Sequence, residues 1–359
     1  MRLTCMDCGN PYPKQQTPYK CPRCGGMFDD LDPIRWQAAD PQQAGIWRYG
    51  PTLGPTAVRV SLGEGNTPLV PAGAFGRQVF FKCEHLNPTG SFKDRGTATL
   101  VSFLVSRGVR QAVEDSSGNA GASFAAYAAR AGIRASVFVP ESAAGPKRMQ
   151  IMKYGADLVL VPGTRSAATT AARKAADGGA VYASHACLPL NIAGYATCAY
   201  EICEGLGVGP RALILPAGQG GLLLGLGRGF RALRDAGVIH DLPVLIGVQA
   251  AACAPLVARS EIGFKRLNLM PESETVAEGV RVSEPVRADA VLEIVRESGG
   301  RFVAVPERRI LPGRDALGRL GFHVEPTSAL VWQAMEATLS DLPDPVVIVL
   351  TGSGYKAMN

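Results

Sequence analysis

The sequence predicts an α/β protein with two domains built around open, mostly parallel, twisted sheets. From about Gln78 onward, short aliphatic or β-branched runs alternate with Ala-rich stretches of helical length. The 359-residue chain is also 47% hydrophobic, which is enough for more than one sizeable core. A repeated strand and helix pattern of this kind is typical of βα units, whose strands pair in parallel.

The expected strands are short β-branched or aliphatic runs: Gln78–Lys82, Gln111–Glu114, Ala135–Val139, Leu158–Val161, Ala180–Ala183, Ala212–Pro216, Val244–Gln249 and Val346–Leu350. The expected helices lie between them and are rich in Ala and Leu: Phe92–Ser106, Gly121–Ala131, Ala144–Tyr154, Ser166–Ala176, Ala193–Leu206, Leu222–Ala236 and Ser328–Leu339. In such a fold, ligands bind in the turns that follow the strands.

Composition argues against nucleic acid and membrane as partners. Charged residues make up 19% of the chain, and its net charge of +6 is spread without a Lys/Arg run or interleaved aromatics. No stretch reaches the roughly 18 apolar residues of a membrane-spanning helix, and the N-terminus lacks the apolar core of a signal peptide. We therefore expect a cytoplasmic protein that acts on a small molecule.

Four of the nine cysteines form two C-x-x-C pairs near the start of the chain. Cys5 and Cys8 form the first pair, Cys21 and Cys24 form the second, and twelve residues separate the pairs. Each pair can form one knuckle, and four thiolates together suit a tetrahedral Zn²⁺ site. Because all four ligands are cysteines, no coordination position stays open, and the zinc is expected to be structural.

One lysine lies in a distinctive loop. The segment Asn87-Pro-Thr-Gly-Ser-Phe-Lys93-Asp-Arg-Gly96 follows an expected strand and opens an expected helix. The helix dipole and desolvation both favour a neutral amine at this position, and a neutral amine is the form that makes an imine with an aldehyde. Lys93 is therefore the candidate catalytic residue.

Three further loops follow expected strands. The segment Ser116-Ser-Gly-Asn-Ala-Gly-Ala-Ser123 precedes an Ala-rich helix, where Ser and Asn are also good helix caps. Pro216-Ala-Gly-Gln-Gly-Gly-Leu-Leu-Leu-Gly225 has glycines that allow backbone N–H groups to approach an anion at a helix N-terminus. Leu350-Thr-Gly-Ser-Gly-Tyr-Lys356 ends the last expected strand with a hydroxyl residue and two glycines.

In this order the four loops, together with Ser61-Leu-Gly-Glu-Gly-Asn-Thr-Pro-Leu69, resemble fold type II pyridoxal-phosphate (PLP) enzymes. This group includes threonine synthase, serine and threonine dehydratases, cysteine synthase and the tryptophan synthase β chain. Within it, the four-cysteine head, Ile46-Trp-Arg-Tyr49 and Leu350-Thr-Gly resemble the threonine-synthase-like branch. The resemblance implies a PLP-dependent lyase that acts on a small amino acid.

The resemblance also assigns roles to single residues. Lys93 would hold PLP as a Schiff base, Asn119 would hydrogen-bond the phenolic oxygen of the cofactor, and Thr351 would contact its pyridine nitrogen. The glycine loop would bind the cofactor phosphate, through Gly218, Gln219, Gly220, Gly221 and Leu222. The substrate would be bound by Ser116, Ser117, Gly118, Ala120 and His185.

Two reactions fit this branch. In the first, O-phosphohomoserine loses phosphate and takes up water to give threonine. In the second, serine, threonine or an activated serine loses its β-group, as in dehydratases or in β-replacement enzymes of the cysteine and cysteate synthase type. A neutral hydroxyl at Thr351 favours elimination chemistry, because it cannot keep a proton on the ring nitrogen as a carboxylate would. A non-catalytic PLP-binding or zinc-ribbon interaction protein is the alternative of another class.

The sequence departs from threonine synthases at the substrate side chain. Residues 184–197 contain no Lys or Arg that could bind a phosphate, and position 120 is Ala where those enzymes usually have Thr. Lys147, Arg148 and His185 are the other candidates for binding a substrate anion.

The expected domains are a zinc ribbon at residues 1–30, a large PLP-binding α/β domain formed by residues 31–98 and 194–359, and a small α/β domain at residues 99–193. The aromatic residues Trp36, Trp47 and Tyr49 are expected to dock the connector after the ribbon on the body of the protein. The resemblance further implies a homodimer.

Overall fold

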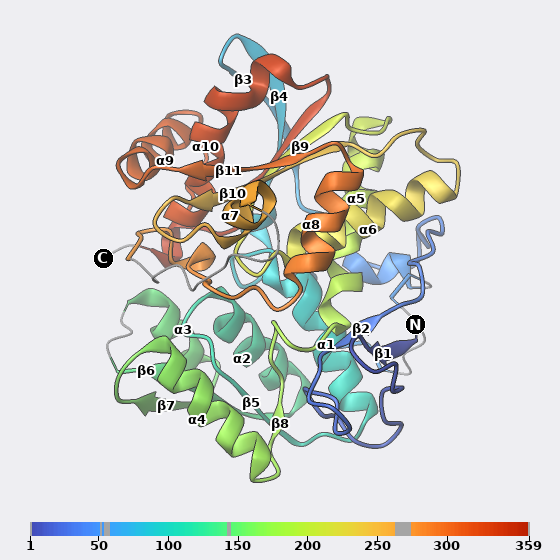
Figure 1. The fold of residues 1–359 in the computed structure, drawn as a ribbon, viewed down its shortest axis with the longest axis vertical. Coiled ribbons are helices and arrows are strands. Elements are labelled where there is room, and N and C mark those ends of the chain that lie inside the picture. The colour runs from blue at the N-terminus through green and yellow to red at the C-terminus, as the bar shows by residue number, and fades with distance from the viewer. Residues whose placement is uncertain (1, 51, 54–57, 142–144, 263–273, 358–359) are drawn as a thin grey trace. The chain divides into compact units, whose positions relative to one another are not determined.

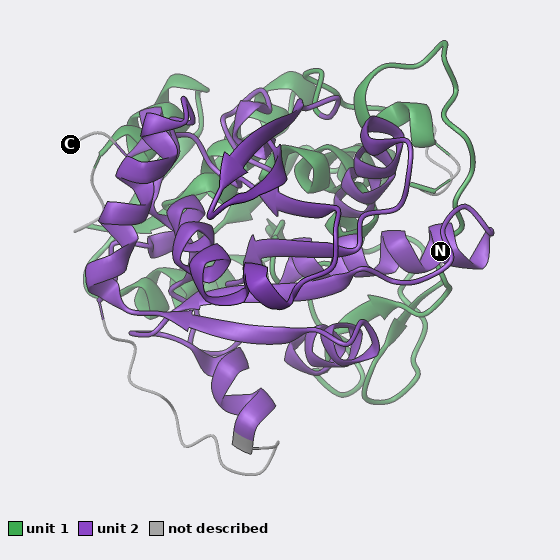
Figure 2. Cartoon of the chain, turned by 90° about the horizontal axis from the view of Figure 1, so that it is seen from above, with its two compact units in different colours: residues 1–64, 93–194, 358–359 green, residues 65–92, 195–357 purple. Residues whose placement is uncertain are grey.

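A computed structural model describes residues 2–50, 52–53, 58–141, 145–262 and 274–357 of this α/β chain (Figure 1). The chain divides into two compact units, which Figure 2 distinguishes by colour. Unit 1 comprises residues 1–64, 93–194 and 358–359, and unit 2 comprises residues 65–92 and 195–357. Each unit contains its own sheet, so the α/β class predicted from the sequence is confirmed.

Unit 2 is built on a six-stranded sheet with the strand order β11-β10-β9-β12-β4-β3. All neighbouring strands pair in parallel except β3, which is antiparallel to β4 at one edge. The strands are β3 (Leu69–Ala74), β4 (Arg77–Lys82), β9 (Ala212–Pro216), β10 (Val244–Ala250), β11 (Arg301–Val305) and β12 (Val346–Val349). Every residue of β9 and β12 is buried, as expected for central strands covered on both faces.

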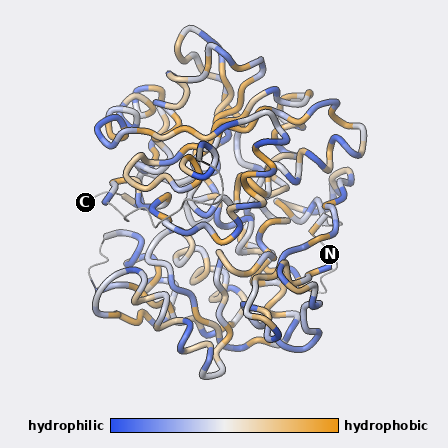
Figure 3. The backbone as a smooth tube through the Cα atoms, in the orientation of Figure 1, coloured by the Kyte–Doolittle hydropathy of each residue, from blue (hydrophilic) through white to orange (hydrophobic). Residues whose placement is uncertain are grey.

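Helices pack against this sheet, and Figure 3 shows the backbone of the chain coloured by hydropathy. The helices are α6 (Gly221–Asp235), α7 (Pro255–Ile262), α8 (Ala288–Glu297), α9 (Ile310–Arg319) and α10 (Pro326–Thr338), together with most of α5 (Leu190–Leu206). α10 packs on β9, β10 and β11 and against α9. Its buried side chains, such as Leu330 and Met335, join those of the strands in one core.

The strand order reverses between β9 and β12. β10 and β11 lie on one side of β9, whereas β12, β4 and β3 lie on the other. In open parallel sheets, ligands bind outside the carboxyl ends of the strands at such a reversal. The glycine loop follows β9, the terminal Thr-Gly-Ser-Gly loop follows β12, and the lysine loop follows β4. All three therefore leave the same edge of one sheet, from adjacent strands.

Unit 1 contains a four-stranded parallel sheet with the order β7-β6-β5-β8. Its strands are β5 (Gln111–Glu114), β6 (Arg134–Pro140), β7 (Asp157–Val161) and β8 (Val181–Tyr182). Its helices are α1 (Lys93–Ser106), α2 (Asn119–Ala131), α3 (Pro146–Lys153) and α4 (Arg165–Asp177). α2 packs on β6 and against α1, whereas α4 packs on β5, β6, β7 and β8.

The N-terminal region also belongs to unit 1. β1 (Leu3–Cys5) and β2 (Phe28–Asp30) pair in antiparallel, and Tyr12 and Phe28 form a small core that packs against Phe103 of α1. In the following connector, Trp47 and Tyr49 are buried, as the sequence predicts, whereas Trp36 is only half-buried.

The connector is fixed to unit 1 by its last residue. The buried carboxylate of Glu64 accepts a hydrogen bond from Tyr127 Oη of α2 at 2.7 Å, and the Glu64 carbonyl accepts one from Ile46 N–H at 3.0 Å. Residues 31–64 and 93–98 thus group with the smaller sheet in unit 1.

All eight expected strands and all seven expected helices are present, with ends shifted by a few residues. The sequence analysis missed β1, β2, β3 and β11 and the helices α7, α8 and α9. The expected helix from Ala144 appears as α3, although Ala144 itself lies outside the described residues. Within the described part of the chain, no helix is both long and apolar enough to cross a membrane.

Candidate active site

The glycine loop forms the turn between β9 and α6. Gly218, Gln219 and Gly220 lie between the two elements, and Gly221 and Leu222 open the helix. Gly220 has a φ of 77°, and a Cβ at this position would lie 2.6 Å from a methyl group of Val291, so only glycine fits.

This turn offers unused hydrogen-bond donors. No side chain caps α6, and the N–H groups of Gly221 and Leu222 make no hydrogen bond with any described residue. The side chain of Gln219 is turned aside, because its Oε1 accepts the N–H of Val286 at 3.0 Å. Backbone N–H groups at the positive end of a helix therefore form a fitting cup for a phosphate such as that of PLP.

Thr351 follows β12 and is 3% exposed. Its backbone N–H donates to Ser328 Oγ of α10 at 2.9 Å, and the neighbouring N–H of Gly352 donates to the same oxygen at 2.8 Å. The side-chain oxygens of Thr351 and Ser328 lie 3.0 Å apart. Ser328 is thus part of this site, although the sequence analysis did not identify it.

The lysine loop is attached to the terminal loop by its backbone. Phe92 N–H donates to the Thr351 carbonyl at 3.1 Å, and Ser353 N–H donates to the Gly90 carbonyl at 2.9 Å. α1 begins at the next residue, Lys93, whose side chain is half-buried. The backbone just before Lys93 is therefore hydrogen-bonded to the loop that contains Thr351.

In unit 1, the Ser-Gly-Asn loop joins β5 to α2. Ser116 is buried, Ser117 and Gly118 are half-buried, and Asn119 and Ala120 are the first residues of the helix. A Cβ on Gly121 would lie 1.8 Å from the Ser116 carbonyl oxygen. Glycine at 121 therefore allows the loop to fold back tightly on the helix start, which leaves its backbone N–H groups near the end of β5.

His185 follows β8, the strand that pairs with β5. Its Nδ1 lies 2.6 Å from Oε1 of Glu114, the last residue of β5, and the two side chains are 15% and 1% exposed. Burial raises the pKa of Glu114 well above its ordinary value, and burial together with the charges of Lys93 and Arg165 lowers the pKa of His185. Both shifts favour a pair without net charge.

The other two candidate anion ligands, Lys147 and Arg148, lie half-buried on α3. The predicted residues thus fall into two sets. Lys93, the Ser116 to Ala120 loop and His185 belong to unit 1, whereas the glycine loop and Thr351 belong to unit 2.

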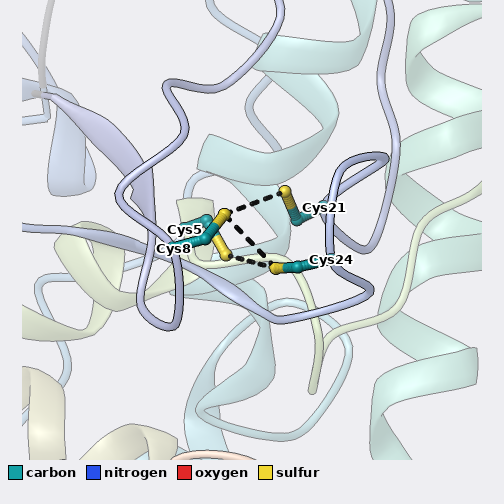
Figure 4. A group of neighbouring side chains, drawn as sticks. All are labelled: Cys5, Cys8, Cys21 and Cys24. Carbon is teal, nitrogen blue, oxygen red and sulfur yellow. Dashed lines mark hydrogen bonds between the residues drawn. The ribbon is translucent and has the colours of Figure 1, made fainter.

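The four N-terminal cysteines point toward one another (Figure 4), and their sulfur atoms all lie within 4.8 Å of one another. The Sγ atoms of Cys5 and Cys24 are 3.5 Å apart, and those of Cys8 and Cys21 are 3.7 Å apart. Thiolates at about 2.3 Å from Zn²⁺ in a tetrahedron are separated by about 3.8 Å, so the cluster fits this ion. Gly26 N–H also donates to Cys24 Sγ at 3.4 Å.

A helix-start cup for a phosphate, a lysine that opens a helix and a hydroxyl after a strand are each features expected of an enzyme that binds a phosphorylated aldehyde cofactor. The chain belongs to the pyridoxal-phosphate dependent enzyme family, whose model matches residues 60–352. The α/β fold type II architecture is accordingly confirmed.

Several curated relatives are threonine synthases. The enzyme of Methanocaldococcus jannaschii is 32% identical over 99% of this chain and 93% of its own length. The enzyme of Mycobacterium tuberculosis is 35% identical, with 83% of each chain covered. The match with the first enzyme includes the four-cysteine region.

Solved structures of related enzymes share the fold. A threonine deaminase from T.th. is 30% identical with a TM-score of 0.67, over 80% of this chain and 92% of its own. A fungal L-serine ammonia-lyase from Rhizomucor miehei is 25% identical with a TM-score of 0.70, over 80% and 93%. The chain is therefore a PLP-dependent enzyme whose resemblance is to threonine synthases in sequence and also to dehydratases in structure.

Proposed function

We propose that this enzyme converts O-phosphohomoserine and water to threonine and phosphate. The observation that carries the proposal is the match with a threonine synthase over 99% of the chain. The solved structures named above match only 80% of it.

In this proposal each site residue has a separate role. Lys93 holds PLP covalently and its amine later removes the α-proton of the substrate as general base. Asn119 donates to the phenolic oxygen of PLP and Thr351 to its ring nitrogen, while Gly218, Gln219, Gly220, Gly221 and Leu222 bind its phosphate. The bound cofactor supplies a ring that withdraws electrons from the α-carbon.

The substrate meets residues of unit 1. Backbone N–H groups of the loop formed by Ser116, Ser117, Gly118 and Ala120 bind the substrate carboxylate, and His185 lies toward the substrate side chain.

A test incubates the purified protein with O-phosphohomoserine, threonine and O-acetylserine separately and assays phosphate, 2-oxo acid and acetate. Phosphate release with threonine formation supports the proposal, whereas 2-oxo acid from threonine alone refutes it. Lys93→Ala should lose both turnover and the visible absorbance of bound PLP.

Dehydratase or β-replacement chemistry is the second candidate. It is favoured by the absence of Lys and Arg from residues 184–197 and by the 30% identity with a threonine deaminase. The same three-substrate assay distinguishes it, because it releases 2-oxo acid or acetate rather than phosphate.

We also propose that Cys5, Cys8, Cys21 and Cys24 bind one structural Zn²⁺ ion, and that the enzyme is a homodimer. The sulfur geometry supports the metal, and four thiolates leave no position for a substrate. Elemental analysis should find about one zinc per chain in protein purified without chelator, and light scattering should give twice the chain mass.

A further inference from the structure

Titratable and charged side chains lie together at the carboxyl edge of the four-stranded sheet in unit 1. Glu114 and Asp115 end β5 and begin its loop, and His185 follows β8. Arg165 opens α4, two residues after the Gly163 turn that ends β7. Because all four strands are parallel, these positions share one edge of the sheet.

The direction of Arg165 follows from its helix. Thr169 lies one turn further along α4, on the same face as Arg165, and Thr169 Oγ1 donates to Asp115 Oδ2. Side chains on a helix lean toward its N-terminus, so Arg165 extends from this face over the strand ends.

Arg165 is half-buried, and its guanidinium makes no hydrogen bond or ion pair with a described residue. Burial is the main cause of the raised pKa of Glu114 and of the lowered pKa of His185, and the charge of Arg165 opposes the first shift and adds to the second. A partly desolvated guanidinium without a carboxylate partner is available for an anionic ligand.

His185 adds a hydrogen-bond donor to the same edge. In a pair without net charge, Glu114 and His185 share one proton between Oε1 and Nδ1. If the carboxyl group holds it, the imidazole is neutral and its other proton is on Nε2. If the imidazole holds it, both ring nitrogens are protonated. In both cases Nε2–H is a donor, and no described residue accepts from it.

We propose that Arg165 and His185 Nε2–H bind the distal phosphate group of the amino-acid substrate, and inorganic phosphate after it leaves. This inference rests on the proposed function and adds to it a cation from α4 that the sequence analysis did not identify. The planar guanidinium offers two parallel donors to a phosphate, and the imidazole adds a third. The arrangement explains how a chain without Lys or Arg in residues 184–197 can recognise a phosphorylated side chain.

The test measures inorganic phosphate binding by calorimetry to full-length, PLP-loaded protein, so that the cofactor phosphate cup is already filled. Arg165→Gln should raise the Kd for phosphate at least about tenfold, whereas Arg165→Lys should recover part of the affinity. The matched control is Lys174→Gln, which removes one charge from an exposed position on the opposite face of α4, and its Kd should stay within about twofold. Visible absorbance and the unfolding midpoint report whether each variant is folded and loaded with PLP.

Measuring the conversion of O-phosphohomoserine distinguishes the proposed reaction from the proposed anion site. If Arg165→Gln loses phosphate binding but the wild-type protein does not convert O-phosphohomoserine, the anion site stands and the proposed reaction fails. If the wild-type protein makes threonine while Arg165→Gln keeps the wild-type KM and the wild-type Kd for phosphate, the anion site is refuted. Absence of phosphate binding to the loaded wild-type protein also refutes it.

Discussion

Ser328 Oγ lies 3.0 Å from Thr351 Oγ1 and accepts the backbone N–H of Thr351 at 2.9 Å. A second N–H, that of Gly352, donates to the same oxygen at 2.8 Å. A hydroxyl oxygen has two lone pairs, and both are occupied by these N–H groups. Ser328 therefore has only a hydrogen to offer, so the Thr351 hydroxyl keeps its own hydrogen for another acceptor. In the proposed site, this hydrogen is available to an unprotonated ring nitrogen of PLP.

We expect Ser328→Ala to weaken PLP binding and destabilise the protein. The substitution leaves two buried N–H groups without their acceptor, and each unsatisfied group costs about 1–3 kcal/mol. The Kd for PLP, measured by titrating cofactor-free protein, should rise at least about fivefold. Ser340→Ala is the control, because Ser340 is exposed and its side chain donates to Asp341, its one hydrogen-bond partner among the described residues. An unchanged Kd in Ser328→Ala would show that Ser328 does not position Thr351.

The buried ion pair of unit 2 provides a second prediction. Lys82 Nζ of β4 lies 2.7 Å from Glu201 Oε2 of α5, and the side chains are 1% and 3% exposed. Lys82 also donates to the Thr67 carbonyl at 2.7 Å. Glu201→Gln should lower the free energy of unfolding by about 3–5 kcal/mol, because it leaves a buried ammonium uncompensated.

The control for this prediction is Glu336→Gln, which breaks the half-exposed ion pair with Arg309. Pairs exposed to solvent contribute about 0–1 kcal/mol. Urea unfolding of both variants gives the comparison. Equal losses in the two variants would contradict the prediction.

The zinc proposal predicts an effect on the helix that begins at Lys93. Tyr12 of the cysteine region packs edge-on against Phe103 of α1, with ring centroids 6.0 Å apart, and Arg107 donates to the Pro13 carbonyl at 2.9 Å. Chelation, or Cys24→Ser, should lower the unfolding midpoint by at least about 5 °C and increase hydrogen exchange in α1.

Lys20→Gln serves as the control for the zinc prediction, because Lys20 is exposed next to Cys21 and is not a ligand. It should retain the zinc content and midpoint of the wild type. Equal exchange in α1 with and without metal would contradict a structural role for the cluster.

Much of the fold was predictable because the central strands are continuous apolar runs. β5 and β9 have the predicted ends, and nearly all of their residues are buried. β3 was missed because Pro71 and Gly73 weaken its strand pattern, which an antiparallel edge strand tolerates. α9 was missed for a related reason: a Cβ on Gly313 would lie 2.9 Å from the Ala329 carbonyl of α10. The close packing of α9 on α10 therefore requires glycine at position 313, and glycine has a low helix propensity.

The candidate site was predictable where its residues are contiguous in sequence. The cysteine pairs and the four loops each carry their own local pattern. Ser328 carries none, because it contacts Thr351, which is distant in the chain, and the proposed role of Arg165 likewise depends on the distant residue His185. Ser328 is 23 residues from Thr351, and the partners His185 and Glu114 are 71 residues apart. Only the strand pairing of β5 with β8 brings the latter two together.

The Glu114 and His185 pair makes stability depend on pH. Burial raises the folded-state pKa of Glu114 above its ordinary value of 4.5, which costs stability as pH rises above 4.5. Burial lowers the folded-state pKa of His185 below 6.5, which costs stability as pH falls below 6.5. Between these pH values the folded pair and the unfolded chain each bind one proton. A rise in pH therefore costs as much stability through Glu114 as it restores through His185, and the stability does not change with pH.

The contribution of the pair should therefore be largest and constant between pH 4.5 and 6.5. Above pH 6.5, His185 of the unfolded chain loses its proton, whereas the folded pair keeps one proton. Below pH 4.5, Glu114 of the unfolded chain gains a proton, whereas the folded pair does not bind a second one. The unfolding free energy of the wild type, minus that of the Glu114→Gln/His185→Gln variant, should fall on both sides by about 1.4 kcal/mol per pH unit. Urea titrations across this range measure the difference. A difference that stays constant above pH 6.5 would show that Glu114 ionises in the folded protein as it does in the unfolded chain.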